Sequence, residues 1–229
     1  MAVVKQIVGL GGGGETDEQT ARLVDHVVSL TRGGRLKVCF VPTAVGDADD
    51  AIARFLAGPW SRHGELSVAQ FFPWPRPDLR DHILDQDIVV VSGGNTANML
   101  AIWRVHGFDA ILREAWDAGV LLTGGSAGMI CWYEAGVTDS FGPQLEGLAD
   151  GLGFLAGSAC PHFDGEPARR PRYSELVSSG FPEGIAADDG VGLHYIGATL
   201  EQVVACRPNA TAYRVTAAGV EPLAATLLS

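Results

Sequence analysis

The strongest chemical signal in the sequence is one serine set among glycine and alanine. Residues 124–128 have the sequence Gly-Gly-Ser-Ala-Gly and follow the apolar run 120–123. A G-x-S-x-G turn between a strand and a helix holds the serine hydroxyl out from the sheet, and small neighbours let strand and helix approach closely. The next amide, that of Ala127, can then stabilise an oxyanion. The pattern predicts a nucleophile at Ser126, although a serine there could also serve only as a helix cap.

A nucleophilic serine needs a base, and the chain has six histidines. Four of them fall on or near predicted helices, away from strand ends, and are expected to pack or to face solvent: His26, His63, His82 and His106. Two candidates remain. His162 follows a predicted strand at 158–161, and His194 lies within a predicted strand at 191–196.

Four acidic residues could complete a triad with one of these histidines: Asp164, Glu166, Asp188 and Asp189. The order typical of α/β-hydrolases would be Ser126, then Asp164 or Asp189, then His194. The other order is Ser126, His162 and Asp189. Spacing alone does not choose between these two arrangements.

The elements that must position these residues alternate between strands and helices. Strands are predicted at 3–10, 36–42, 66–71, 87–92 and 120–123, with helices after Thr16, over 48–63 and on either side of Gly107. This order predicts a doubly wound, mostly parallel α/β sheet. Further short strands, expected to extend or flank that sheet, are predicted at 158–161, 184–187, 191–196, 200–206 and 212–215. The whole chain, 1–229, is predicted to form a single domain.

Glycine-rich turns follow three of the predicted strands, at 11–14, 93–95 and 124–128. Ligands of open parallel sheets bind beyond the carboxyl ends of the strands, so this convergence predicts the site. The run 11–14 does not fit a dinucleotide site, because Thr16 stands where G-x-G-x-x-G needs glycine. It also lacks the lysine of a phosphate loop, so no nucleotide cofactor is expected.

Composition narrows the functional classes. The chain of 229 residues has a net charge of −11, is 47% hydrophobic and is only 19% charged. This composition excludes disorder and disfavours nucleic-acid binding. The four cysteines are scattered singly, so neither a zinc site nor a disulfide framework is expected. With no signal-peptide pattern and no apolar stretch long enough to cross a membrane, a cytoplasmic protein is expected.

Together these motifs resemble the dipeptidase E (α-aspartyl dipeptidase) family of serine peptidases, which includes cyanophycinase. The resemblance rests on Gly-Gly-Asn-Thr at 93–96, Gly-Ser-Ala-Gly at 125–128, Pro-His-Phe at 161–163 and the acidic pair 188–189, together with the N-terminal glycine turn. It implies a three-layer α/β/α sandwich similar to the class I glutamine amidotransferase domain. It also implies a peptidase that cleaves short peptides and uses no metal or cofactor. It does not decide between a monomer and a homodimer.

Site residues carried over from this resemblance follow the matching motifs. It implies Ser126 as nucleophile and His162 as base, with Asp189 at a triad position that is glutamate in dipeptidase E and Asp188 as the alternative. The oxyanion donors implied are Gly94 and Ala127. Substrate contacts are implied for Asn95, Arg169, Arg170 and Arg172. Three arginines within four positions would make a positive patch that could attract an acidic dipeptide to an acidic protein.

The expected function is therefore hydrolysis of dipeptides with an N-terminal aspartate through a Ser-His-Asp triad. Two other classes remain open from the sequence. One is a different serine hydrolase, such as an esterase with His194 as base or a cyanophycinase-like peptidase. The other is a catalytically silent, amidotransferase-like binding module.

Overall fold

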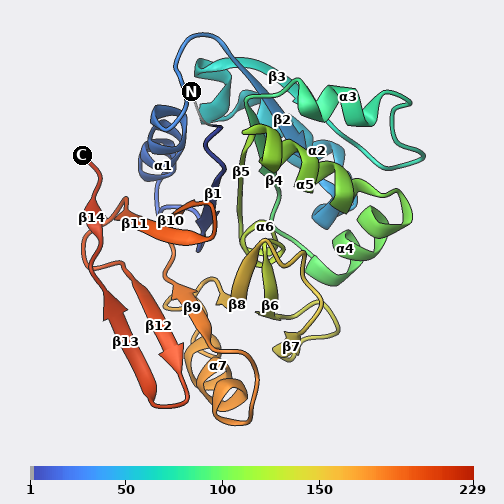
Figure 1. Ribbon diagram of the computed structural model, residues 1–229. Helices are drawn as coiled ribbons and strands as arrows, with labels where there is room; N and C mark the ends of the chain where they lie inside the picture. The colour runs from blue at the N-terminus through green and yellow to red at the C-terminus, as the bar shows by residue number, and fades with distance from the viewer. Residues whose placement is uncertain (1–2) are drawn as a thin grey trace.

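The computed structural model describes residues 3–229, and the first two residues of the predicted domain lie outside this range (Figure 1). Its larger sheet has eight strands, in the spatial order β14 (Thr226–Leu227), β11 (Thr199–Ala205), β10 (Val191–Ile196), β1 (Gln6–Leu10), β5 (Leu121–Gly125), β4 (Ile88–Val91), β2 (Leu36–Val41) and β3 (Gly64–Val68). The five neighbouring strands β1, β5, β4, β2 and β3 run parallel to one another. Strand β10 runs antiparallel to both of its neighbours, β1 and β11.

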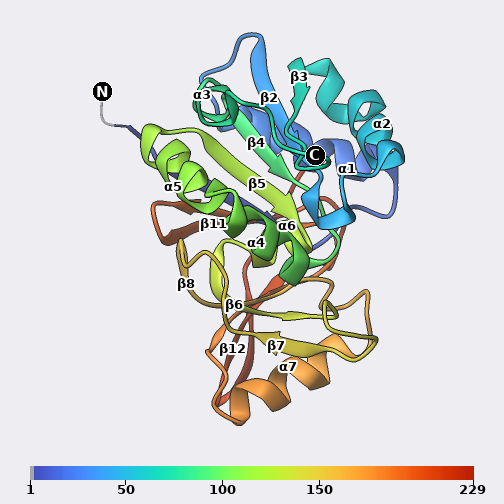
Figure 2. The same ribbon diagram turned by 90° about the vertical axis from the view of Figure 1, so that its right-hand side faces the viewer.

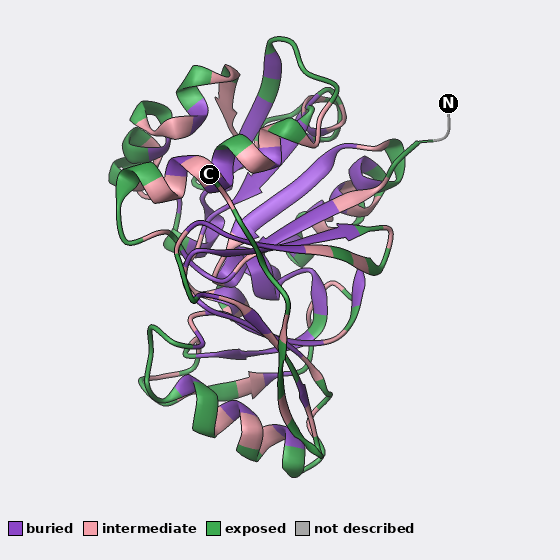
Figure 3. Cartoon of the chain, turned by 90° about the vertical axis from the view of Figure 1, so that its left-hand side faces the viewer, coloured by how far each residue is buried: buried purple, intermediate pink, exposed green. Residues whose placement is uncertain are grey.

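Helices cover both faces of this sheet (Figures 1 and 2). Side chains of α1 (Asp17–Ser29), α2 (Asp49–Ala57) and the 3₁₀ turn η2 (Pro59–Arg62) pack on one face, against Val38 and Val90. Side chains of α3 (Leu79–Leu84), α4 (Thr96–Val105) and α5 (Phe108–Ala118) pack on the other, against Cys39 and Val89. Neighbouring residues of a strand point to opposite faces, so a strand covered on both sides must be apolar throughout. The buried central strands in Figure 3 follow this rule.

A second sheet of six strands lies beside the first, in the order β13 (Gly219–Leu223), β12 (Ala212–Thr216), β9 (Gly184–Ala187), β8 (Leu155–Cys160), β6 (Tyr133–Thr138) and β7 (Glu146–Leu148). Helix α7 (Arg169–Ser178) packs on it through Tyr173 and Val177 (Figure 2). One buried cluster joins the two sheets, with Leu122 from the first and Ala159 from the second. The predicted α/β class with a mostly parallel central sheet is confirmed, and the later strands both extend and flank it.

Local sequence signals explain several boundaries. The hydroxyl of Thr16 accepts a hydrogen bond from the amide of Gln19 and caps α1, as the sequence predicts. The predicted helix over 48–63 is instead broken at Gly58 into α2 and η2. The strand predicted at 66–71 is shifted to Gly64–Val68, because its register is set by pairing with β2. No helix within residues 3–229 is long and apolar enough to span a membrane.

Candidate active site

Ser126 lies at a sharp turn between β5 and α6 (Ala127–Ile130). Its backbone has φ 56° and ψ −114°, a conformation that costs a non-glycine residue about 1–3 kcal/mol. The glycines on either side are forced by packing: a Cβ at Gly124 would lie 2.6 Å from the carbonyl oxygen of Val91, and one at Gly128 would lie 2.5 Å from the same atom. The turn therefore has the strain and the crowding that a nucleophile elbow requires.

His162 and Asp189 form a direct pair. Nδ1 of His162 lies 2.6 Å from Oδ1 of Asp189, and both side chains are partly exposed. His162 follows β8 and Asp189 follows β9, two neighbouring parallel strands of the second sheet. A carboxylate that accepts from Nδ1–H fixes the tautomer in which Nε2 has a free lone pair. Nε2 of His162 is then the atom able to take a proton.

The last residue of β1 and the glycine turn after it connect the three residues of this candidate triad. The carbonyl of Leu10 accepts from the amide of Ser126 at 3.2 Å, and the carbonyl of Gly11 accepts from the amide of His162 at 3.0 Å. The next carbonyl, that of Gly12, accepts from the amide of Gly190 at 3.3 Å, directly after Asp189. Three consecutive carbonyls thus hold nucleophile, base and acid in register across two sheets. The sequence predicts that this turn lies at the site, but it does not predict these three contacts.

Gly12→Ala is expected to separate the His162–Asp189 pair. A Cβ at Gly12 would overlap the carboxylate of Asp189 and lie 2.9 Å from Nδ1 of His162. Displacing a catalytic group by about 1 Å can cost about 100-fold in rate, so a loss of kcat of that size is expected. Gly13→Ala is the matched control, since its Cβ would meet only Oγ1 of Thr20 at 3.5 Å. Equal kcat values for both folded variants would contradict this role of the turn.

The predicted oxyanion donors flank Ser126. A Cβ on Gly93 would lie 3.3 Å from Cβ of Ser126, so the turn after β4 lies against the nucleophile. Gly94 has φ +129° and approaches Ala44 so closely that a side chain there would overlap its carbonyl. The amides of Gly94 and Ala127 donate to no residue within the described range 3–229. Because α6 is a single turn, these two N–H groups rather than a helix dipole would bind the oxyanion.

Asn95 has a structural partner for each polar atom of its side chain. Its Oδ1 accepts from the amide of Asn98 at 2.9 Å and caps α4, and its Nδ2 donates to the carbonyl of Ser140 at 2.9 Å. The side chain therefore holds the segment between β6 and β7 next to the turn after β4, which contains the predicted oxyanion donor Gly94. One N–H of Nδ2 and one lone pair of Oδ1 are used in this way, and the contact of Asn95 with substrate stays a prediction.

Arg169 and Arg172 also hold this segment. Arg169, with a side chain only 4% exposed, donates to the carbonyl of Val137 and pairs with Glu166. Arg172 donates to the carbonyl of Leu145 at 2.9 Å and pairs with Glu175. Both guanidinium groups thus attach α7 to β6 and to the segment that follows it, and their contact with substrate stays a prediction.

Arg170 is the member of the trio that remains exposed. Its guanidinium lies over the rings of Phe163 and Tyr213, with its carbon 4.9 and 4.8 Å from their centroids. Within residues 3–229 no carboxylate pairs with it. Stacking leaves the N–H groups at the edge of the guanidinium free for an anion. Phe163 follows His162 in the chain, so Arg170 stacks on the residue next to the candidate base.

The alternative base, His194, lies two residues along β10 from the position that is paired with Leu10. In β10 it stands opposite Val8, whereas Gly192 stands opposite Leu10, whose carbonyl holds Ser126. Its Nε2 is paired with Oε1 of Gln6 at 2.9 Å, and burial lowers its pKa. The structure does not bring His194 together with Ser126.

The alternative acids also have other partners. Asp188 is buried, accepts from the amide of Thr211 at 3.0 Å and lies 3.4 Å from the hydroxyl of Tyr213. Burial raises the pKa of the Asp188 carboxyl. Glu166 pairs with Arg169, and Asp164 pairs with a residue that sequence reasoning missed, Arg207.

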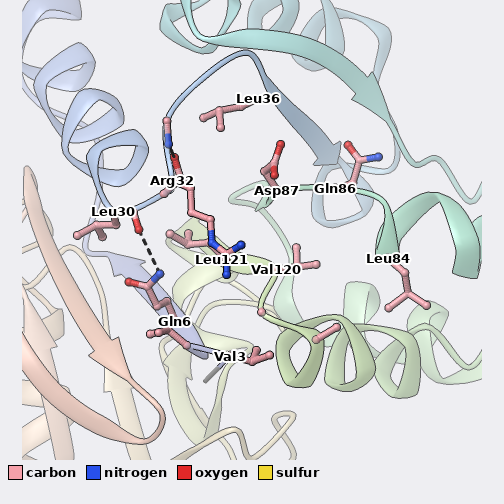
Figure 4. Close-up of a pocket in the computed structure, with 15 residues that line it drawn as sticks. Val3, Gln6, Leu30, Arg32, Leu36, Leu84, Gln86, Asp87, Val120 and Leu121 are labelled. Carbon is pink, nitrogen blue, oxygen red and sulfur yellow. Dashed lines mark hydrogen bonds between the residues drawn. The ribbon is translucent and has the colours of Figure 1, made fainter. Parts of the chain in front are cut away.

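A cavity of about 450 Å³ opens at the other end of the main sheet, beside Gln6, Asp87 and Leu121 (Figure 4). It lies at the amino ends of the parallel strands and none of the candidate triad residues lines it. The exposed side chain of Arg32 extends into it (Figure 4). The candidate active site is therefore placed at the carboxyl ends of the strands, not at this cavity.

Comparisons with known proteins show the family and the fold of the chain. The model of peptidase family S51 matches residues 7–203. An uncharacterized peptidase of Bacillus subtilis (strain 168), YgaJ, is 45% identical over 214 residues, which cover 93% of this chain and 92% of that protein. In fold, the chain resembles a peptidase from an acI-B1 actinobacterium, with a TM-score of 0.69, 18% identity and coverage of 97% of this chain and 95% of that chain.

A putative peptidase E protein from Listeria monocytogenes EGD-e has a similar fold as well. Its TM-score is 0.63 at 17% identity, with 93% of this chain and 100% of that chain covered. At such low identity the two structures support the fold alone, whereas the family model and the Bacillus relative cover nearly the whole sequence. The resemblance inferred from the motifs is confirmed: the chain belongs to peptidase family S51, the dipeptidase E family of serine peptidases.

Proposed function

We propose that the protein is a serine dipeptidase that hydrolyses short peptides with an N-terminal aspartate, using Ser126, His162 and Asp189. The observation that carries the proposal is the run of three consecutive carbonyls at the end of β1 and in the turn after it. They bind the amide of Ser126, the amide of His162 and the amide that follows Asp189. The pairing of His162 Nδ1 with Asp189 Oδ1 at 2.6 Å supports the assignment of base and acid.

The reaction proceeds in two halves. Nε2 of His162 takes the hydroxyl proton of Ser126 while the oxygen attacks the peptide carbonyl, and Asp189 stabilises the imidazolium. The amides of Gly94 and Ala127 hold the oxyanion of the tetrahedral intermediate. His162 then gives its proton to the leaving amine, and an acyl-enzyme forms. Water, activated by the same histidine, releases the acid product and restores Ser126, so the steps use only side chains, amides and water.

Recognition of the acidic substrate is assigned to Arg170. The net charge of −11 repels an acidic peptide at long range, so a local cation is needed beside the site. Arg170 supports this role because its guanidinium is exposed and stacks on the residue after His162.

The cytoplasm is the proposed location of the protein. Its four cysteines are buried free thiols, and a reducing compartment would keep them in that state.

A dipeptide library tests the substrate class. Purified protein is assayed on Asp-X, isoAsp-X, Glu-X and neutral X-X peptides, together with a simple ester. The highest kcat/KM is expected for Asp-X. A higher value for the ester or for neutral dipeptides would overturn the aspartyl specificity while leaving the serine mechanism standing.

Arg170→Ala is expected to act on KM and to do so selectively. A hydrogen bond to a charged group contributes about 1.5–3 kcal/mol, so kcat/KM for Asp-X should fall about 10- to 100-fold. Neutral dipeptides provide the internal control, because their low kcat/KM should hardly change. Arg54→Ala, at an exposed ion pair with Asp50 on α2, controls for loss of one positive charge. A uniform loss on all peptides would argue against substrate recognition by Arg170.

A further inference from the structure

We propose that the ion pair between Arg207 and Asp164 is a positioning device for the triad acid, Asp189. This inference rests on the proposed function, since it assigns a role toward that same triad. Arg207 follows β11, and Asp164 comes two residues after His162.

The ion pair grips both main-chain polar groups of Asp189. Oδ1 of Asp164 accepts from the Asp189 amide at 2.9 Å. Nε of Arg207 donates to the Asp189 carbonyl at 2.9 Å. Nη2 of Arg207 pairs directly with Oδ2 of Asp164, which closes the ring. One ion pair thus holds residue 189 at its N–H and at its C=O.

The side chain of Asp189 depends on this backbone hold. Among the described residues its carboxylate has one hydrogen-bond partner, His162, so no second side chain fixes its rotamer from the other side. A Cβ at Gly165 would overlap this carboxylate, which shows how closely the loop after Asp164 encloses it. Moving the peptide of residue 189 would therefore move the carboxylate away from Nδ1 of His162.

Burial and charge strengthen the hold. The side chain of Arg207 is only 15% exposed and that of Asp164 is 38% exposed, so solvent screens this pair from the side of Asp164 but less than it screens a pair exposed at both ends. The charged groups around it are Asp164, Asp188 and, at 3.8 Å from Nη1, Glu15 of the segment before α1. Leaving Asp164 without its partner in this acidic setting would repel it from Asp189 and open the loop.

Positioning predicts a kinetic effect that a merely structural ion pair would not produce. A displaced Asp189 no longer orients the ring of His162 and no longer stabilises the imidazolium that forms in the transition state. The kcat of each folded molecule and the rate of Ser126 labelling should therefore fall, while KM changes little. A loss of stability alone would reduce the amount of folded enzyme and leave the kcat of each folded molecule unchanged.

The experiment compares Arg207→Met, Arg207→Lys and Asp164→Asn with Arg54→Met, which breaks a solvent-exposed ion pair on α2. For each folded variant, kcat and KM on the best dipeptide are measured, with the thermal midpoint as a folding control. The rate of Ser126 labelling by a fluorophosphonate gives a readout that does not depend on the substrate. Arg207→Met should lose about 100-fold in kcat and in labelling rate, with KM nearly unchanged.

Intermediate variants sharpen the test. Lysine at 207 keeps the charge but cannot bind the carbonyl and the carboxylate together, so a partial loss is expected. Asparagine at 164 keeps an acceptor for the Asp189 amide and loses the charge, so a partial loss is expected there too. Arg54→Met should match the unmodified protein.

The outcomes separate the two proposals. A folded Arg207→Met protein with unchanged kcat and unchanged labelling rate would overturn the positioning role. So would a loss of activity that only follows the thermal midpoint, with no partial rescue by lysine. Absence of labelling in the unmodified protein would instead overturn the serine mechanism, and the positioning role with it.

Discussion

Ser126→Ala should reduce kcat on the best dipeptide by about a million-fold, because removal of the nucleophile leaves only binding and the oxyanion amides. Covalent labelling by a fluorophosphonate should disappear with it. Ser178→Ala, at a hydroxyl that donates only to the carbonyl of Glu175 in its own helix, is the matched control and should keep full activity. Retained turnover in Ser126→Ala would remove the serine from the mechanism.

A second substitution at the same position separates chemistry from strain. Ser126→Gly is also expected to be inactive, but glycine adopts φ 56° without the steric cost that serine or alanine carries. Its free energy of unfolding should exceed that of Ser126→Ala by about 1 kcal/mol or more, measured by chemical denaturation. Equal stability of the two inactive variants would mean that the turn stores no strain.

The sequence predicts the parts of this site that depend on local pattern. Gly124 and Gly128 flank Ser126 because the strand-to-helix turn crowds Val91, and that crowding is visible as a motif. The apolar run at 87–92 predicts a strand covered on both faces, and β4 is one. Pattern alone therefore predicts the central sheet and the nucleophile's turn.

Other parts depend on contacts between distant segments, which no local pattern contains. Arg169 looks like a free cation in the sequence, yet the carbonyl of Val137, on β6, receives it in the folded chain. Arg207 belongs to no sequence motif. Its contacts with Asp164 and Asp189 form only in the folded chain, where the end of β11 lies next to the turns after β8 and β9. The spacing of residues in the sequence could not choose between His162 and His194 for the same reason. In the folded chain His162 is bound to Gly11, next to the Leu10 that binds Ser126, whereas His194 stands opposite Val8. The order of residues along the chain does not contain this difference.

His162→Ala is expected to lower kcat by about 10⁶-fold, since the serine then has no base. His194→Ala should leave kcat nearly unchanged, because His194 faces Gln6 within the main sheet. It should instead lower the free energy of unfolding by about 1–3 kcal/mol, the usual cost of opening a buried site and leaving a polar partner unpaired. Full activity without His162, together with loss of activity without His194, would support the esterase-like arrangement and overturn the proposed triad.

The neighbouring aspartates allow the same comparison for the acid. Asp189→Asn should reduce kcat by about 10⁴-fold, because an amide in place of the carboxylate favours the wrong imidazole tautomer and no longer stabilises the imidazolium. Asp188→Asn should keep kcat, since its oxygen can still accept from the amide of Thr211.

Asp188→Asn should also change how stability depends on pH. Burial raises the pKa of Asp188 in the folded protein above its ordinary value of 3.8. The folded state therefore holds this proton more tightly than the unfolded chain, and its contribution to stability is present below that value and lost as pH rises through the folded pKa. Asparagine does not titrate, so the Asp188→Asn variant lacks this loss of stability. Between pH 3.8 and the higher pKa of Asp188 in the folded protein, its free energy of unfolding should fall less than that of the unmodified protein. Denaturation curves at a series of pH values measure the difference, and an unaltered slope would mean that Asp188 is as well solvated in the folded protein as in the unfolded one.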